Sequence, residues 1–192
     1  MTEPMTYCST RGQAPDLAFA DALLTGLATD GGLYCPQSIP ALPEQIPGAY
    51  ADAANAIMWP FVVGSIEPEA FAAIVAESYR SFRHPDVCPV VELGDNHYLL
   101  DLTQGPTLAF KDVALQLVGR LLDHELERRG ERVTVLGATS GDTGSAAIEG
   151  VAASASPASA PPSPALGVTP LVRSGAVPAS LRNAGCAGWP AS

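Results

Sequence analysis

Lys111 is the first candidate for chemistry, because it is the only lysine in the chain. The chain has ten basic residues, and the other nine are arginines. Lys111 lies in the segment GPTLAFKD, residues 105–112, between Phe110 and Asp112. A lysine amine can form a Schiff base with a carbonyl compound, and burial favours its neutral, nucleophilic form. A solvated surface charge is the alternative interpretation, and the residues alone leave both open.

A second candidate is the turn GATSGDTGSAA, residues 137–147. Glycine lets the backbone approach a ligand closely, and a turn rich in Gly, Ser and Thr before a helix offers free N–H groups to an anion. An ordinary tight turn is the alternative interpretation. The segment is not a Walker A loop, because no Gly-Lys-Ser/Thr follows, and it is not G-x-G-x-x-G.

Cysteines and histidines indicate no metal site. The three histidines lack metal-ligand spacing, and the cysteines are scattered without a C-x-x-C pair. We expect reduced thiols of a cytosolic protein rather than a disulfide framework. The four cysteines are Cys8, Cys35, Cys88 and Cys186.

The charge balance excludes several classes of partner. The net charge is −10 and the pI is near 4.5, whereas nucleic acids and anionic membranes select basic patches. No apolar stretch has the length that a bilayer span needs. Residues 1–11 contain Glu3 and Pro4 and no apolar run, so no secretory signal is expected. We therefore expect a cytoplasmic protein without nucleic-acid or membrane partners.

The elements around the two candidate segments predict an open parallel sheet. A strand–helix–strand–loop–helix order is typical of a βαβ unit. Ligands of such sheets bind beyond the carboxyl ends of the strands, so loops 103–107 and 139–144 are expected at one edge. The expected elements are a strand at 97–102, a helix at 108–129 ended by Gly130, a strand at 132–138 and a helix that begins at 145.

The segments before residue 84 and after residue 150 differ from this pattern. Helices are expected at 16–29, with Asp16 as N-cap, and at 68–83, with a proline-rich extended connection at 36–48 between them. A domain boundary is expected near 84–90. In residues 151–192, 29 of the 42 residues are Ala, Ser, Pro or Gly and none is acidic. That composition predicts a disordered tail, and translation out of frame is the alternative interpretation.

Four segments together carry a resemblance to a known family. GPTLAFKD, followed by ATSGDTGSAAIEG, resembles the signature of threonine synthases among the fold-type II pyridoxal-phosphate (PLP) enzymes. YCSTRG at 7–12 and DGGLYCP at 30–36 resemble the N-terminal domain of the same family. Related PLP dehydratases lack those two segments. The resemblance covers residues 5–150.

The resemblance implies a chemistry and a fold. Threonine synthases are PLP-dependent carbon–oxygen lyases, which convert O-phospho-L-homoserine and water to L-threonine and phosphate. Lys111 matches the lysine that holds PLP, and the loop that binds the substrate carboxylate beside the cofactor matches Ser140, Gly141, Asp142, Thr143 and Gly144. The implied fold is α/β, with a small α-rich domain at 1–84, the start of an incomplete PLP-binding α/β domain at 85–150, and a tail at 151–192.

The sequence departs from the family pattern in two ways that bear on whether the chain is active. Thr103 and Gln104 stand where the family often has a histidine before Gly-Pro-Thr. The second half of the family sequence has no counterpart, so we expect a truncated or frameshifted, inactive form. A non-catalytic interaction module that keeps the N-terminal domain is the alternative. A nucleotide-binding protein is disfavoured by the missing Walker lysine.

Overall fold

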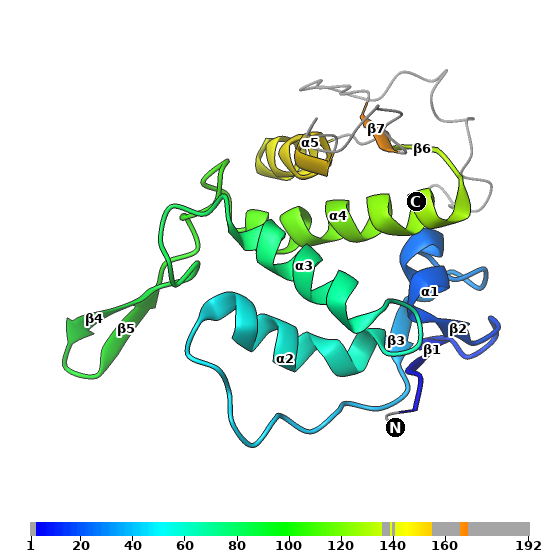
Figure 1. Ribbon diagram of the computed structural model, residues 1–192, viewed down its shortest axis with the longest axis horizontal. Coiled ribbons are helices and arrows are strands. Elements are labelled where there is room, and N and C mark those ends of the chain that lie inside the picture. The colour runs from blue at the N-terminus through cyan, green and yellow to red at the C-terminus, as the bar shows by residue number, and fades with distance from the viewer. Residues whose placement is uncertain (1–2, 136–138, 140, 155–165, 169–192) are drawn as a thin grey trace, which may run out of the picture.

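The computed structural model describes residues 3–135, 139, 141–154 and 166–168 (Figure 1). Helix α3 (Pro68–Tyr79) packs between α2 (Tyr50–Val62) and α4 (Asp112–Arg129). Helix α5 (Asp142–Ser154) packs on the other side of α4. No helix within the described residues has the length and apolarity to cross a membrane.

A small antiparallel sheet and one short helix form the N-terminal end. β1 (Thr6–Ser9) pairs with β2 (Leu17–Ala18) and β3 (Tyr34–Pro36), with Tyr7 opposite Leu17 and Cys8 opposite Cys35. The helix expected at 16–29 is shorter than predicted, because α1 (Phe19–Thr25) begins after β2 and ends at Gly26, which has a positive φ of 69°. Asp16 is not its N-cap but accepts a hydrogen bond from Gln37.

The middle of the chain adds a helix that the sequence pattern did not predict. α2 contains Pro60 in its last turn. The connection expected at 36–48 is confirmed as free of helix and strand after β3 ends at Pro36. α3 begins with Pro68 at its first position, as expected, but ends at Tyr79 rather than at 83.

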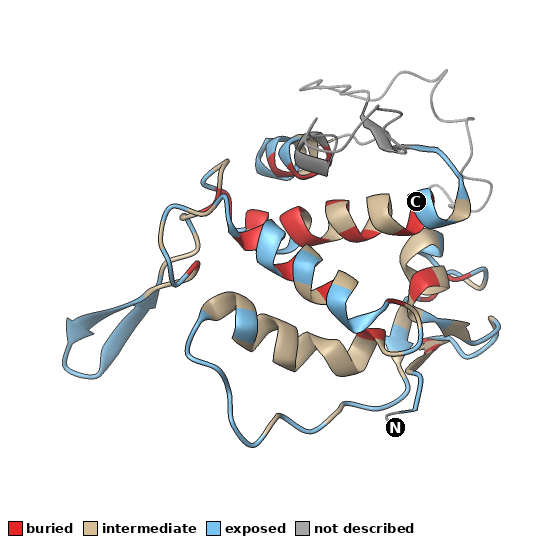
Figure 2. Cartoon of the chain, in the orientation of Figure 1, coloured by how far each residue is buried: buried red, intermediate tan, exposed pale blue. Residues whose placement is uncertain are grey.

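One hydrophobic core joins α4 to the helices before it. Its members come from both sides of the boundary expected near 84–90, and Figure 2 shows buried residues on the facing sides of α3 and α4. The helix that follows Lys111 is therefore anchored on the N-terminal helices. The core residues are Val62, Ile66, Phe71, Val75, Tyr79, Val87, Leu117 and Leu121.

The strand expected at 97–102 belongs to a hairpin and not to a parallel sheet. β5 (His97–Leu100) pairs antiparallel with β4 (Val90–Gly94) across Asp95 and Asn96, which both have positive φ. The predicted βαβ unit from β5 through α4 is therefore wrong. Both strands are exposed along their whole length, and the hairpin projects away from the helices (Figure 2).

The parallel pairing lies one element later. β6 (Val133–Val135) pairs in parallel with β7 (Leu166–Val168), and α5 is the crossover between them. Gly130, in the left-handed conformation, ends α4 as predicted. The helix expected from 145 begins at Asp142 instead, because the carbonyl of Gly141 accepts the first helical hydrogen bonds from Gly144 and Ser145.

The tail expected to be disordered from residue 151 is only partly described. Residues 151–154 belong to α5 and residues 166–168 to β7, so the prediction is wrong for these two segments. Residues 155–165 and 169–192 lie outside the described part of the chain, and the out-of-frame interpretation stays a prediction.

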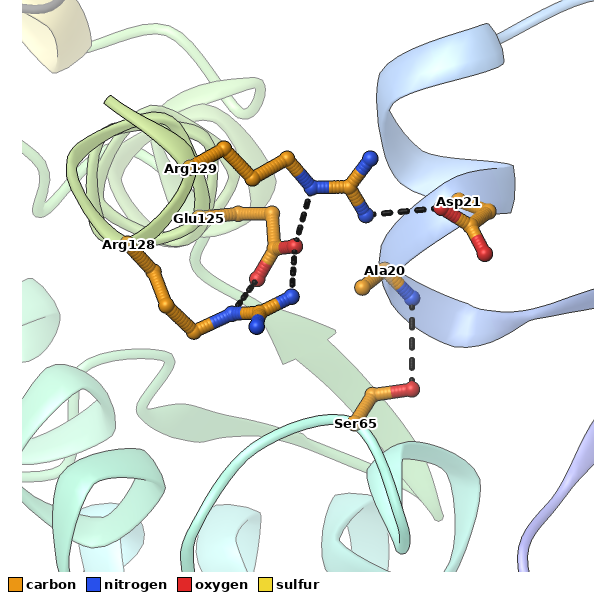
Figure 3. Close-up of polar contacts among 6 residues, drawn as sticks. All are labelled: Ala20, Asp21, Ser65, Glu125, Arg128 and Arg129. Carbon is orange, nitrogen blue, oxygen red and sulfur yellow. Dashed lines mark hydrogen bonds and ion pairs between the residues drawn. The ribbon is translucent and has the colours of Figure 1, made fainter. Parts of the chain in front are cut away.

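A buried carboxylate ties the end of α4 to α1. Glu125 is 1% exposed and accepts hydrogen bonds from Arg128 and Arg129, and Arg129 also donates to Asp21 of α1 (Figure 3). Nε of Arg129 lies 2.6 Å from the Glu125 carboxylate. The hydrogen bond from Arg128 is the main cause that lowers the pKa of Glu125.

Replacing Glu125 by alanine is expected to lower the free energy of unfolding by about 2 kcal/mol, because charge-assisted hydrogen bonds to a buried acceptor are lost. Partial exposure of both arginines keeps the effect below that of a fully buried pair. Urea unfolding measures it. Glu127→Ala, at an exposed position of the same helix, is the matched control, and an equal loss in the two variants would contradict the expectation.

Hydrogen bonds join the two N-terminal segments of the family resemblance. The Ser9 hydroxyl of YCSTRG donates to both carboxylate oxygens of Asp30 in DGGLYCP, at 2.7 and 2.8 Å. The same carboxylate accepts backbone N–H groups of Gln13, Ala14 and Gly32. These segments therefore have a structural role: Asp30 holds together the loop 10–14 and the glycine pair that follows it.

The Ser9 hydroxyl is the main cause that lowers the pKa of Asp30 to about 2. Since the unfolded pKa is about 3.9, the stabilisation is complete above about pH 4 and is lost as the pH falls towards 2. Ser9→Ala is expected to raise the pKa of Asp30, which an NMR titration of its carboxyl carbon measures. Ser38→Ala, at an exposed position, is the control. An unchanged pKa in Ser9→Ala would contradict the assignment.

Candidate functional site

Lys111 lies where an irregular turn enters α4. Its φ of −67° and ψ of −19° are helical, and Asp112 is the first residue of the helix. The predicted helix start at 108 is wrong, because Leu108 has a left-handed φ of 64° and cannot continue a right-handed helix. The turn is closed by hydrogen bonds from Leu108 N–H to the Gly105 carbonyl and from Asp112 N–H to the Ala109 carbonyl.

The carboxylate of Asp112 faces back into this turn. Asp112 is 0% exposed and accepts hydrogen bonds from the backbone N–H of Thr107 at 2.7 Å and from its hydroxyl at 2.8 Å. A side chain at Gly105 would overlap the Asp112 carboxylate, so only glycine fits there. The sequence analysis did not single out Asp112 as a site residue, although its place beside the lysine was the available signal.

The side chain of Lys111 is half-buried and points over an aromatic ring. Its Nζ lies 4.1 Å from the centroid of the Phe110 ring, which is a cation–π distance. Within the part of the chain that the structure describes, no ion pair engages this amine. Phe110 and Leu108 beside it are 57% and 52% exposed. The arrangement is a half-buried lysine flanked by exposed apolar side chains.

The glycine-rich turn is organised by a residue that the sequence analysis missed. The Thr139 hydroxyl oxygen accepts hydrogen bonds from the N–H groups of Gly141 at 3.1 Å and Gly144 at 2.9 Å. A Cβ at Gly144 would lie 2.8 Å from that oxygen, which explains the glycine. A threonine shortly before a helix start is typical of a capping side chain and was the available signal.

The predicted loop residues lie at the N-terminal end of α5. Asp142 and Thr143 are exposed, and Gly141 and Gly144 take part in the Thr139 turn, while Ser140 lies outside the described residues. The turn follows β6, as expected of a ligand loop in a parallel sheet. Loop 103–107 instead follows the hairpin strand β5, so its expected place at the same sheet edge is wrong.

Helices α4 and α5 cross in close contact, and this contact links the two candidate segments because each segment leads into one of the helices. A Cβ at Gly119 would lie 2.5 Å from the Gly150 carbonyl oxygen, and a Cβ at Gly150 would lie 2.5 Å from that of Leu115. Lys111 precedes α4 and the Thr139 turn precedes α5, so one tight helix pair carries both. No hydrogen bond or ion pair between described residues joins Lys111 to residues 141–144 directly.

Comparison with known proteins decides the family. The family model described as Threonine synthase N terminus matches residues 6–79. The threonine synthase of Pseudomonas aeruginosa is 56% identical over 151 residues, which are 76% of this chain and 32% of that protein. The chain belongs to the threonine synthase family, of which it carries the N-terminal part. The predicted resemblance and the mixed α/β class are thus confirmed.

Solved threonine synthases share the fold. The crystal structure of PLP-bound threonine synthase from Brucella melitensis superposes with a TM-score of 0.74 at 51% identity, over 77% of this chain and 33% of that one. Yeast threonine synthase gives 0.70 at 40% identity, over 76% and 33%. The chain thus spans about a third of the length of the threonine synthases that it matches.

Thr103 and Gln104, which depart from the family pattern, directly precede the turn at 105–111 that leads to Lys111. Asp101 accepts hydrogen bonds from the Thr103 N–H and hydroxyl and from the Gln104 amide. The hydroxyl bond from Thr103 is the main cause that lowers the pKa of Asp101. The Gln104 carbonyl accepts the N–H of Arg83. These two residues therefore connect the end of the hairpin to the segment that follows α3.

Metal-ligating side chains do not gather in the described ranges. Among residues 3–135, 139, 141–154 and 166–168, no three His, Cys, Asp or Glu residues are placed to hold a metal ion. Cys8, Cys35 and Cys88 are free thiols, and Cys186 lies outside the described residues.

Proposed function

We propose that this chain supplies the cofactor-binding lysine of a cytoplasmic, PLP-dependent threonine synthase, which converts the small molecule O-phospho-L-homoserine, with water, to L-threonine and phosphate. One observation carries the proposal. The only lysine of the chain directly precedes α4, at the end of a turn that the buried Asp112 carboxylate holds in place. The surrounding sequence is 56% identical to a threonine synthase.

The residues around Lys111 fit PLP. An aldehyde reacts with an amine that no carboxylate holds, and Lys111, a half-buried residue, takes part in no ion pair among the described residues. A flat heteroaromatic ring needs apolar walls, which the exposed side chains of Leu108 and Phe110 can provide. When bound, PLP supplies an electron sink that stabilises negative charge on the substrate carbons.

Two groups of the chain have roles beside the cofactor. Lys111 would hold the cofactor through its side-chain amine, and the same amine would accept the proton of the substrate α carbon. The turn at 139–144 binds the substrate carboxylate through backbone N–H groups at the start of α5 and through the Thr143 hydroxyl. Asp142 contributes its N–H rather than its side chain, because two carboxylates repel each other.

A chimera tests the proposed activity. Residues 1–150 are joined to the part of the Pseudomonas aeruginosa threonine synthase that follows its matched segment. We expect PLP-dependent release of phosphate from O-phospho-L-homoserine, with the complete Pseudomonas enzyme as positive control. A folded chimera that binds PLP but releases no phosphate, and forms no threonine, would contradict the proposal.

A further inference from the structure

The buried carboxylate of Asp112 has no part in the chemistry described so far. It is fully buried, and burial of a carboxylate is unfavourable unless hydrogen bonds satisfy it. Both of its hydrogen bonds go to Thr107, five residues earlier, so they close the turn that leads into Lys111. The geometry of that turn therefore depends on Asp112.

The direction of the Asp112 side chain determines the direction of the Lys111 side chain, because both residues have helical backbone geometry. Lys111 has helical φ and ψ, and consecutive side chains of a helix point about 100° apart. With the Asp112 side chain directed inward, that of Lys111 must leave the helix beside Phe110, where its Nζ lies 4.1 Å from the ring centroid.

The turn also holds a conformation that its sequence does not favour. Leu108 has a φ of 64°, a backbone conformation that is strained for residues other than Gly, Asn or Asp. A residue keeps such a conformation only when its surroundings impose it. The two bonds from Thr107 to Asp112 and the contact of Gly105 with Asp112 are these surroundings.

We propose that Asp112 is the positioning residue of Lys111, and that it acts through its two hydrogen bonds to Thr107. The inference rests on the proposed role of Lys111 in holding PLP. Asp112 does not touch the cofactor or the substrate. It fixes the direction in which the lysine amine is presented, and it does so before any ligand binds.

The single lysine makes this orientation measurable without cofactor. Reductive methylation of the 192-residue chain with ¹³C-formaldehyde gives one lysine dimethyl signal besides that of the amino terminus. Methyl groups above an aromatic ring are displaced to lower frequency, so the displacement reports how close Lys111 is to Phe110. Lys111→Arg identifies the signal, and Phe110→Leu gives the value without the ring.

Asp112→Ala removes both bonds and is expected to lose at least half of the displacement. Asp112→Asn is expected to keep it, because its amide oxygen accepts the Thr107 N–H and its NH₂ donates to the rotated hydroxyl. Folded Asp112→Ala with the wild-type displacement would overturn the proposal. So would Asp112→Asn with the displacement lost, since charge rather than hydrogen bonding would then hold the lysine.

Unfolding of each variant is followed in parallel, because a purely structural Asp112 would lower the unfolding midpoint and leave the lysine signal of the folded chain unchanged. If Asp112→Ala does not fold, Thr107→Val decides, since it removes the hydroxyl bond alone. A reduced displacement in Thr107→Val supports the proposal, and an unchanged one overturns it. Both outcomes are independent of PLP binding, so failure of the proposed enzymatic function is a separate result.

Discussion

Lys111→Ala in the chimera is expected to abolish covalent attachment of PLP and to lower the rate of phosphate release by about 10²–10⁴-fold, the effect of losing a positioned acid–base group. The variant loses the only lysine side-chain amine of this chain's segment that can react with the cofactor aldehyde. The rate of phosphate release at saturating substrate measures the effect, and the visible absorption of the cofactor follows its attachment.

Lys111→Arg separates the chemistry of this amine from its charge. The guanidinium keeps the positive charge over Phe110 but stays protonated, so it can neither react with an aldehyde nor accept a proton. We expect it to be as inactive as Lys111→Ala. An arginine variant with near wild-type turnover would show that Lys111 acts only as a charge, and the proposed role would be wrong.

The 192-residue chain, assayed by itself, is expected to show no threonine synthase turnover within the ordinary enzyme range of about 1–10³ s⁻¹. It corresponds to about a third of the threonine synthases that it matches, and it offers the lysine and one turn. Positioning of the reactants can lower the activation barrier by roughly 7–11 kcal/mol. A lysine with one turn provides little of that positioning.

Phosphate release by the purified chain is compared with that of Lys111→Ala. Equal background rates are expected, and the chimera serves as the positive control. PLP-dependent turnover in the enzymatic range by the chain alone, absent in Lys111→Ala, would contradict this expectation and would make these 192 residues a minimal enzyme.

Local features of the sequence were predicted well because short segments determine them. Pro68 at the start of α3 and Gly130 at the end of α4 follow from the backbone preferences of single residues. The Lys111 segment was found because one residue type is confined to it. Each of these inferences needs only neighbouring residues.

Strand partners were predicted poorly because pairing is not local. The strand at 97–100 fits a parallel sheet or a hairpin equally well by its residues, and Asp95-Asn96 before it was the overlooked turn signal. The helix begins at 112 rather than 108 because Leu108 has a left-handed φ, which hydrophobic periodicity does not record. α2 was missed although Pro60 falls in its last turn and does not prevent the helix.

Trapping of the cofactor tests the central claim, that Lys111 holds PLP. The chimera is incubated with PLP, reduced with borohydride and digested with trypsin. Reduction fixes the adduct and protects the modified lysine from cleavage, so the added mass is expected on the peptide of residues 84–120, which contains Lys111 and ends at Arg120. Cofactor mass on any other peptide, with residues 84–111 and 112–120 recovered as separate unmodified peptides, would contradict the account.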